Sequence, residues 1–138
     1  MGKINWGRVF LGGVLFGVVG GILLFCDVNL LARDFLAAVQ ARGQFPESKV
    51  VQLGMCLVAM ILLGIWTIWL YAAIRPRYGP GPKTAAIVGL ATALFGTLAD
   101  VCWGLMGFVP PASLVAGVVV AVPIVIVATL VGAWPYKE

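Results

Sequence analysis

Two aspartates are the residues of this sequence best suited to chemistry, because each falls inside a long apolar run. A carboxylate within a membrane-spanning segment costs roughly 3 kcal/mol on insertion scales, so it usually faces protein or water rather than lipid. Asp27 and Asp100 both meet this description. Two neighbouring carboxylates raise each other's proton affinity, which suits a proton- or cation-coupled site. Gln52 is the nearest polar residue expected to complete the cluster.

A structural interpretation of the same residues competes with this functional one. Asp27 and Asp100 lie toward one end of their apolar runs, where the insertion penalty declines. Each carboxylate can then hydrate near the interface, or bond to a neighbouring helix and fix its register. The structural interpretation is favoured because the aspartates are displaced from the membrane centre. Both interpretations remain open at this stage.

Other chemistry finds little support in the residue types. The sequence contains no histidine, which removes the commonest ligand of zinc and haem and the usual proton shuttle. Its cysteines, Cys26, Cys56 and Cys102, are dispersed without a C-x-x-C pair. No Gly-rich phosphate loop or nucleophile elbow appears. We therefore expect no catalytic residues, no metal site, no cofactor and no enzymatic activity.

The elements that must position these residues are four long apolar runs, at about 9–32, 50–74, 84–109 and 112–134. Each run exceeds the roughly 20 residues with which a helix crosses a bilayer. Of the residues, 62% are hydrophobic and only 10% are charged, so there are too few polar side chains to cover the surface of a soluble domain of this size. The sequence thus predicts an all-α, four-transmembrane-helix bundle that forms a single membrane domain over 1–138.

The two longer connections carry their own signals. Residues 33–43 predict a short helical extension on the external surface, which Gly43 is suited to end. Pro46 and Glu47 suit the first turn of the second span. Residues 75–83 contain three prolines and two glycines, so they predict a rigid turn outside any helix.

The basic residues predict the orientation in the membrane. One side would carry six of the nine, Lys3, Arg8, Arg75, Arg77, Lys83 and Lys137, and the other side Arg33, Arg42 and Lys49. By the positive-inside tendency, both termini are cytoplasmic (N-in, C-in), and the connection at 109–111 is external. The net charge of +4 is then a signal of topology and of contact with membrane lipids, and no nucleic acid partner is expected.

Small residues recur on three of the four predicted helices at spacings that place them on one face. Such stripes let a neighbouring backbone approach closely, either within the bundle or from another protein. The glycines expected to serve helix packing are Gly13, Gly17, Gly21, Gly89, Gly96, Gly104, Gly117 and Gly132.

The amino-terminal string Ile4-Asn5-Trp6-Gly7-Arg8, followed by Leu11-Gly12-Gly13, resembles a class of small uncharacterised bacterial four-helix integral membrane proteins. This resemblance implies a bacterial cytoplasmic (inner) membrane location and transfers no functional residue. The preferred function is a non-enzymatic structural or accessory subunit, which packs against another membrane protein or in a homo-oligomer. The alternative is a small proton- or cation-coupled transporter that uses Asp27 and Asp100.

Overall fold

A computed structural model describes residues 4–108 and 111–136 of the chain. The basic residues Lys3 and Lys137, and most of the predicted external connection at Val109 and Pro110, lie outside the described residues.

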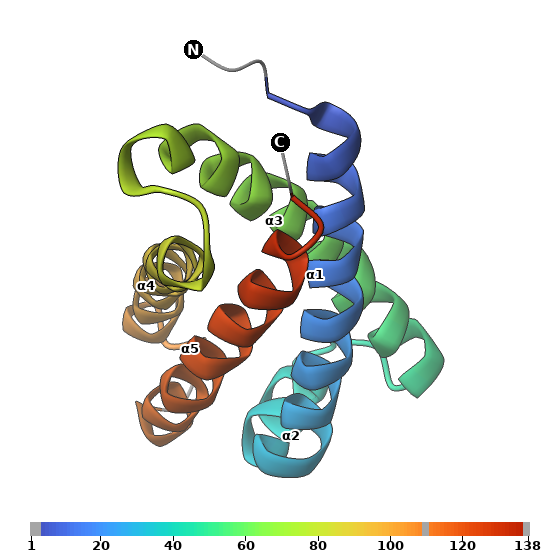
Figure 1. Ribbon diagram of the computed structural model, residues 1–138. Coiled ribbons are helices and arrows are strands. Elements are labelled where there is room, and N and C mark those ends of the chain that lie inside the picture. Colours follow the sequence, from blue (N-terminus) through green and yellow to red (C-terminus); the bar gives the residue numbers. More distant parts are fainter. Residues whose placement is uncertain (1–3, 109–110, 137–138) are drawn as a thin grey trace.

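The described residues form helices joined by short turns, without any strand. Helix α1 (Trp6–Cys26) continues into a π-helix, η1 (Asp27–Leu31), and α2 (Arg33–Ala41) follows after one residue. The remaining helices are α3 (Lys49–Tyr78), α4 (Pro82–Leu105) and α5 (Pro111–Ala133). Both ends of the chain lie at the same end of the bundle, and α2 lies at the other (Figure 1).

Four helical segments are long and apolar enough to cross a membrane: Trp6–Leu31, Lys49–Tyr78, Pro82–Leu105 and Ala112–Ala133. They correspond to the four runs predicted from the sequence, and the chain is therefore an all-α, multi-pass membrane protein. The helical extension is also present, as α2. Gly43, just after it, adopts a φ of 65°, a left-handed conformation that glycine accepts without strain.

The ends of α3 correct two sequence-based predictions. The helix begins at Lys49 rather than at Pro46 and Glu47, and it continues through Pro76 to Tyr78 instead of ending at Ile74. A proline removes only one backbone donor, which is tolerable in the last turn of a helix that already has thirty residues. The helix ends at Gly79, whose φ is 82°, so the turn before α4 is shorter than the composition suggested.

The most extensive helix contact joins α1 to α3, and three glycines of α1 lie in it. A Cβ atom on Gly13 would lie 2.7 Å from the backbone nitrogen of Ile65, and one on Gly17 would lie 2.6 Å from the Cα of Ile61. A Cβ atom on Gly21 would lie 3.0 Å from the Cα of Leu57. Successive turns of α1 therefore rest directly on the α3 backbone, as small-residue stripes in membranes allow.

Glycines also bring α5 against its neighbours, although not at every predicted position. Gly132 packs on the Gly12 backbone of α1, and Gly89 of α4 packs on Ile126 and Thr129 of α5. Gly104 faces Leu114 across the α4–α5 hairpin. By contrast, added Cβ atoms on Gly96 and Gly117 would meet nothing within 4 Å, so these two glycines make no close helix contact within the described chain.

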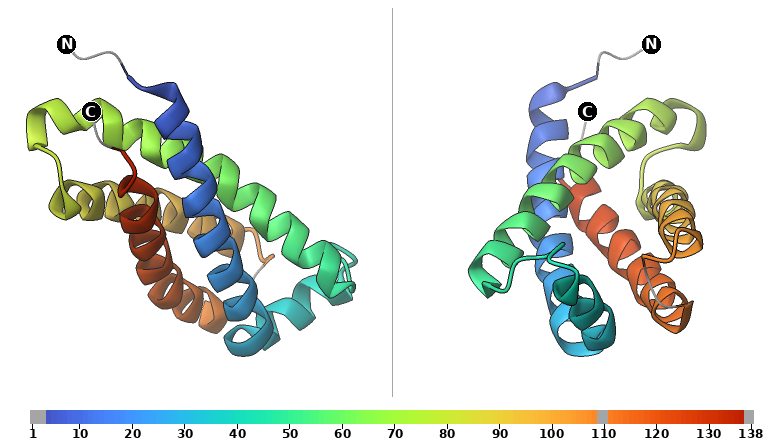
Figure 2. Two further views of the ribbon diagram at one scale, coloured as in Figure 1. Left: turned by 45° about the vertical axis from the view of Figure 1, so that its right-hand side comes forward. Right: turned by 180° about the vertical axis from the view of Figure 1, so that it is seen from behind.

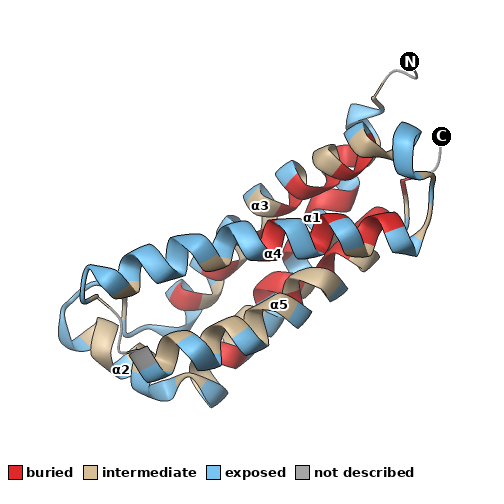
Figure 3. Cartoon of the chain, turned by 90° about the vertical axis from the view of Figure 1, so that its left-hand side faces the viewer, coloured by how far each residue is buried: buried red, intermediate tan, exposed pale blue. Residues whose placement is uncertain are grey.

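The core lies toward the end of the bundle that holds the termini. Its largest cluster includes Val9, Ile68, Tyr71, Val88 and Tyr136, and a smaller cluster lies nearer the middle. Buried residues gather near that end, whereas the far halves of α4 and α5 are largely exposed or half-buried (Figure 3). Helices α3 and α4 diverge from the turn that joins them and touch little (Figure 2).

We expect Gly17→Ala to lower the free energy of unfolding by about 1–3 kcal/mol, because the new methyl group forces α1 away from the α3 backbone. Gly96→Ala is the matched control, since its methyl group enters open space and alanine favours the helix. Unfolding of the detergent-solubilised protein, followed by circular dichroism, measures both. Equal stability of the two variants would contradict the α1–α3 contact described above.

Candidate acidic cavity

A cavity of about 180 Å³ lies at the end of the bundle away from the termini. Three of its lining side chains are polar, Asp27, Asp100 and Ser113. The other lining residues are Leu24, Val28, Ala32, Phe35, Leu114, Gly117 and Ala121. Helices α1, α2, α4 and α5 and the π-helix η1 all contribute to the wall. The fold thus brings the two sequence-predicted aspartates, 73 residues apart in the chain, to one cavity.

Asp27 occupies the first position of the π-helix. Its carbonyl oxygen accepts a hydrogen bond from the backbone nitrogen of Ala32 at 2.9 Å, five residues later, so this turn is wider than an α-helical turn. Single π-turns within helices often occur at functional sites. The Asp27 side chain is only 7% exposed, and it has no hydrogen-bond or ion-pair partner among the described residues. Asp27 lines the cavity, so its carboxylate can be reached by water or a ligand there although the residue as a whole is buried. Without such a partner, burial of a carboxylate is costly.

Asp100 lines the same cavity from α4. It lies in α4, about one and a half turns before the helix ends at Leu105. In contrast to Asp27, it is exposed in the isolated chain, and it also lacks a partner among the described residues. No lysine or arginine lines the described cavity. Protonation or a bound cation would neutralise the two carboxylates there, and water would only solvate them.

Gln52 does not join the aspartates, which differs from the expectation based on sequence. Its side chain is 1% exposed and its Oε1 accepts a hydrogen bond from Asn29 Nδ2 at 3.3 Å. Its Nε2 donates to the Pro46 carbonyl oxygen at 2.7 Å, and Gln40 Nε2 donates to the same oxygen at 3.3 Å. Asn29 lies in the π-helix with Asp27 but turns toward α3, so Gln52 belongs to a separate polar cluster that anchors the loop before α3.

Arg42 holds the end of α2 against the α4–α5 hairpin. Its guanidinium group donates to the Phe108 carbonyl oxygen at 2.7 Å and to the Gly107 carbonyl oxygen at 3.1 Å. Because α2 supplies Phe35 to the cavity and the hairpin supplies Ser113, this contact fixes two walls relative to each other. In the sequence, Arg42 contributes only to the count of basic residues, since nothing local indicates a partner 65 residues away.

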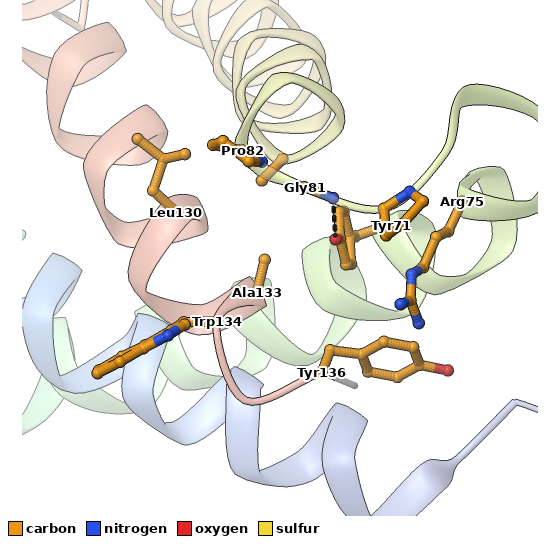
Figure 4. A pocket seen from close by; sticks show the side chains of 10 residues that line it. Tyr71, Arg75, Gly81, Pro82, Leu130, Ala133, Trp134 and Tyr136 are labelled. Atoms are coloured by element: carbon orange, nitrogen blue, oxygen red, sulfur yellow. Dashed lines mark hydrogen bonds between the residues drawn. The ribbon is translucent and has the colours of Figure 1, made fainter. Parts of the chain in front are cut away.

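A second cavity, of about 350 Å³, lies at the end that holds the termini (Figure 4). The Tyr71 hydroxyl accepts a hydrogen bond from the Gly81 nitrogen at 3.2 Å, and the Tyr136 hydroxyl accepts one from the Asn5 nitrogen at 3.3 Å. The Arg75 guanidinium carbon lies 5.5 Å from the Tyr136 ring centroid, as a cation–π contact requires. These contacts join the ends of four spans, and we assign this cavity a structural role despite its larger volume.

The part of the chain that the structure describes contains no cluster of side chains suited to bind a metal ion. No group of three or more histidine, cysteine, aspartate or glutamate side chains there could hold an ion. Cys26, Cys56 and Cys102 are all free thiols, of which only Cys56 is buried.

Comparison of the chain with protein-family models, curated proteins and solved structures gave no match. The acidic cavity is therefore interpreted from its own geometry.

We expect Arg42→Gln to loosen the cavity wall, because it removes two hydrogen bonds donated by a charged group. Amide hydrogen exchange within α2 should accelerate roughly ten-fold, while exchange in α1 stays unchanged. Arg77→Gln, a change at the opposite end of the bundle, is the control and should leave α2 unaffected. Mass spectrometry of the deuterated protein gives both rates. Unchanged α2 exchange in Arg42→Gln would exclude a positioning role for Arg42.

Proposed function

We propose that this protein is a small, non-enzymatic integral membrane transporter. It binds a proton or another cation between Asp27 and Asp100, and movement of this cation across the membrane drives transport. The observation that carries the proposal is the buried carboxylate of Asp27, which lacks a partner among the described residues and shares a cavity with Asp100. Intramembrane carboxylates with this placement commonly mark proton or ion pathways.

The glycine contacts support this choice over the accessory function. Gly13, Gly17 and Gly21 pack against α3 of the same chain, and Gly132 packs against α1. These positions are therefore already occupied and are not available to dock another protein. The side chains of the two aspartates, in contrast, make no hydrogen bond or ion pair with other described residues, so neither side chain joins two helices.

We place both termini in the cytoplasm of a bacterial cell, so that the acidic cavity faces the outer side of the cytoplasmic membrane. Arg8, Arg75, Arg77 and Lys83 support this orientation, because all four lie toward the end of the bundle that holds the termini. Cations arriving from outside would then reach the cavity that Asp27 and Asp100 line.

We expect Asp27→Asn and Asp100→Asn each to lower coupled cation flux at least roughly ten-fold, because asparagine keeps the shape of aspartate but carries no charge. Charge movement on solid-supported membranes, after jumps in proton, sodium, potassium or methylammonium concentration, measures the flux of the reconstituted protein. Asp34→Asn, in exposed α2, is the control. Absence of charge movement in the wild-type protein, or full flux in both variants, would refute the transport proposal.

The far half of α4 favours a second candidate function, that of a subunit in a membrane assembly. Its apolar side chains are unusually exposed within the chain, with Phe95 at 75% and Leu105 at 84%. Gly96 lies among them with open space before it, which allows a neighbouring backbone to approach closely. A second copy or another membrane protein would cover this face, and lipid would cover it otherwise.

We expect Gly96→Leu to dissociate any such assembly, because leucine fills the space in which a partner backbone would lie. Native mass spectrometry of the protein extracted gently from its own membranes reports the composition. The control is Ala59→Leu, which enlarges an exposed residue of α3 instead. Recovery of the wild-type protein as a monomer would rule out the subunit function and leave the transport proposal as the only candidate.

A further inference from the structure

We infer that the cation held between Asp27 and Asp100 is a small organic ammonium ion rather than a metal ion, an inference that rests on the proposed cation-binding function. Its ammonium group would lie between the two carboxylates and its alkyl part against the apolar wall of the cavity.

The first argument is the chemistry of the lining. Apart from Asp27, Asp100 and Ser113, every residue that lines the cavity is apolar. Leu24 and Phe35 contribute the largest of these apolar side chains, and α5 contributes Leu114. An inorganic cation gains nothing from such a wall. An alkyl chain does, and each methylene moved from water to an apolar surface improves affinity about four-fold.

The second argument is the number of oxygen ligands. Calcium takes six to eight oxygens, whereas two carboxylates and the Ser113 hydroxyl present at most five, so water would have to complete its shell. An ammonium group has three N–H donors and no need of a closed shell. Two carboxylates and the Ser113 hydroxyl match those donors in number.

The third argument is size. A cavity of about 180 Å³ corresponds to roughly six water molecules, each of which occupies about 30 Å³ in the liquid. This is smaller than the roughly 300 Å³ at which pockets for drug-sized ligands begin. An ion of roughly six non-hydrogen atoms, the size of pentylammonium, fits this volume. Because the cavity is partly open, a longer alkyl group would extend beyond its wall and gain less from it.

The test is isothermal titration calorimetry of the purified full-length protein with the n-alkylammonium chlorides from ammonium to octylammonium, and with sodium, potassium and calcium chlorides at equal ionic strength. We expect affinity to rise about four-fold per methylene and to level off or fall beyond about five carbons. Asp27→Asn should weaken the best ligand at least ten-fold, and Asp34→Asn should leave its affinity unchanged.

Gly117→Leu tests where the alkyl chain lies. An added Cβ at Gly117 meets no atom within 4 Å, so the first atom of a new side chain has space, and Gly117 lines the cavity that a leucine there would partly fill. The preferred ligand should shorten by about three carbons while binding still depends on Asp27. An unchanged preference for chain length would place the alkyl group elsewhere and overturn the inference.

The remaining outcomes separate this inference from the proposed function. Binding of sodium, potassium or calcium that depends on Asp27, without any gain from alkyl length, would overturn the ammonium assignment and keep the cation site. Absence of Asp27-dependent binding for every cation tested would overturn both. A rise in affinity with chain length that persists in Asp27→Asn would show simple partition into detergent or apolar surface, and it would also overturn the inference.

Discussion

The direct contact between the backbones of α1 and α3 is the constraint on which the rest of the structure depends. In a bilayer, apolar helices gain little from excluding lipid, so association relies on close packing. Gly13, Gly17 and Gly21 provide it by placing three turns of α1 on the α3 backbone. Gly12 and Gly132 then bring α5 onto the same helix. Helix α1 thus has both α3 and α5 packed directly on it.

This arrangement concentrates packing near the termini and leaves the far end more open. Tyr71 and Tyr136 join the ends of the spans by hydrogen bonds and a ring contact at one end, whereas α4 diverges from α3 toward the other. The acidic cavity occupies that less packed end. The π-helix at the end of α1 places Asp27 in the cavity and Asn29 toward Gln52, so two polar side chains two residues apart serve different neighbours.

Several features of the fold could be predicted from the sequence because they depend on local composition. The four spans follow from the length of the apolar runs, and α2 follows from the spacing of Phe35, Leu36 and Val39 together with Gly43. The prediction for residues 75–83 was wrong at Pro76, which lies inside α3. The number of prolines in a segment does not show where the helix ends, because the last turn of a long helix tolerates the loss of one backbone N–H donor. The glycine stripes indicated close contacts but not which glycines would have a neighbour.

The candidate site shows the same division between local and distant information. The sequence alone determined that Asp27 and Asp100 lie late in apolar spans, because hydropathy and residue type are properties of short segments. Only the tertiary structure decided that both line one cavity, that Gln52 pairs with Asn29, and that Arg42 reaches Gly107 and Phe108. Those relations depend on how far helices diverge after their closest contact. That divergence is set by the summed packing of whole helix faces, and no single stretch of sequence encodes it.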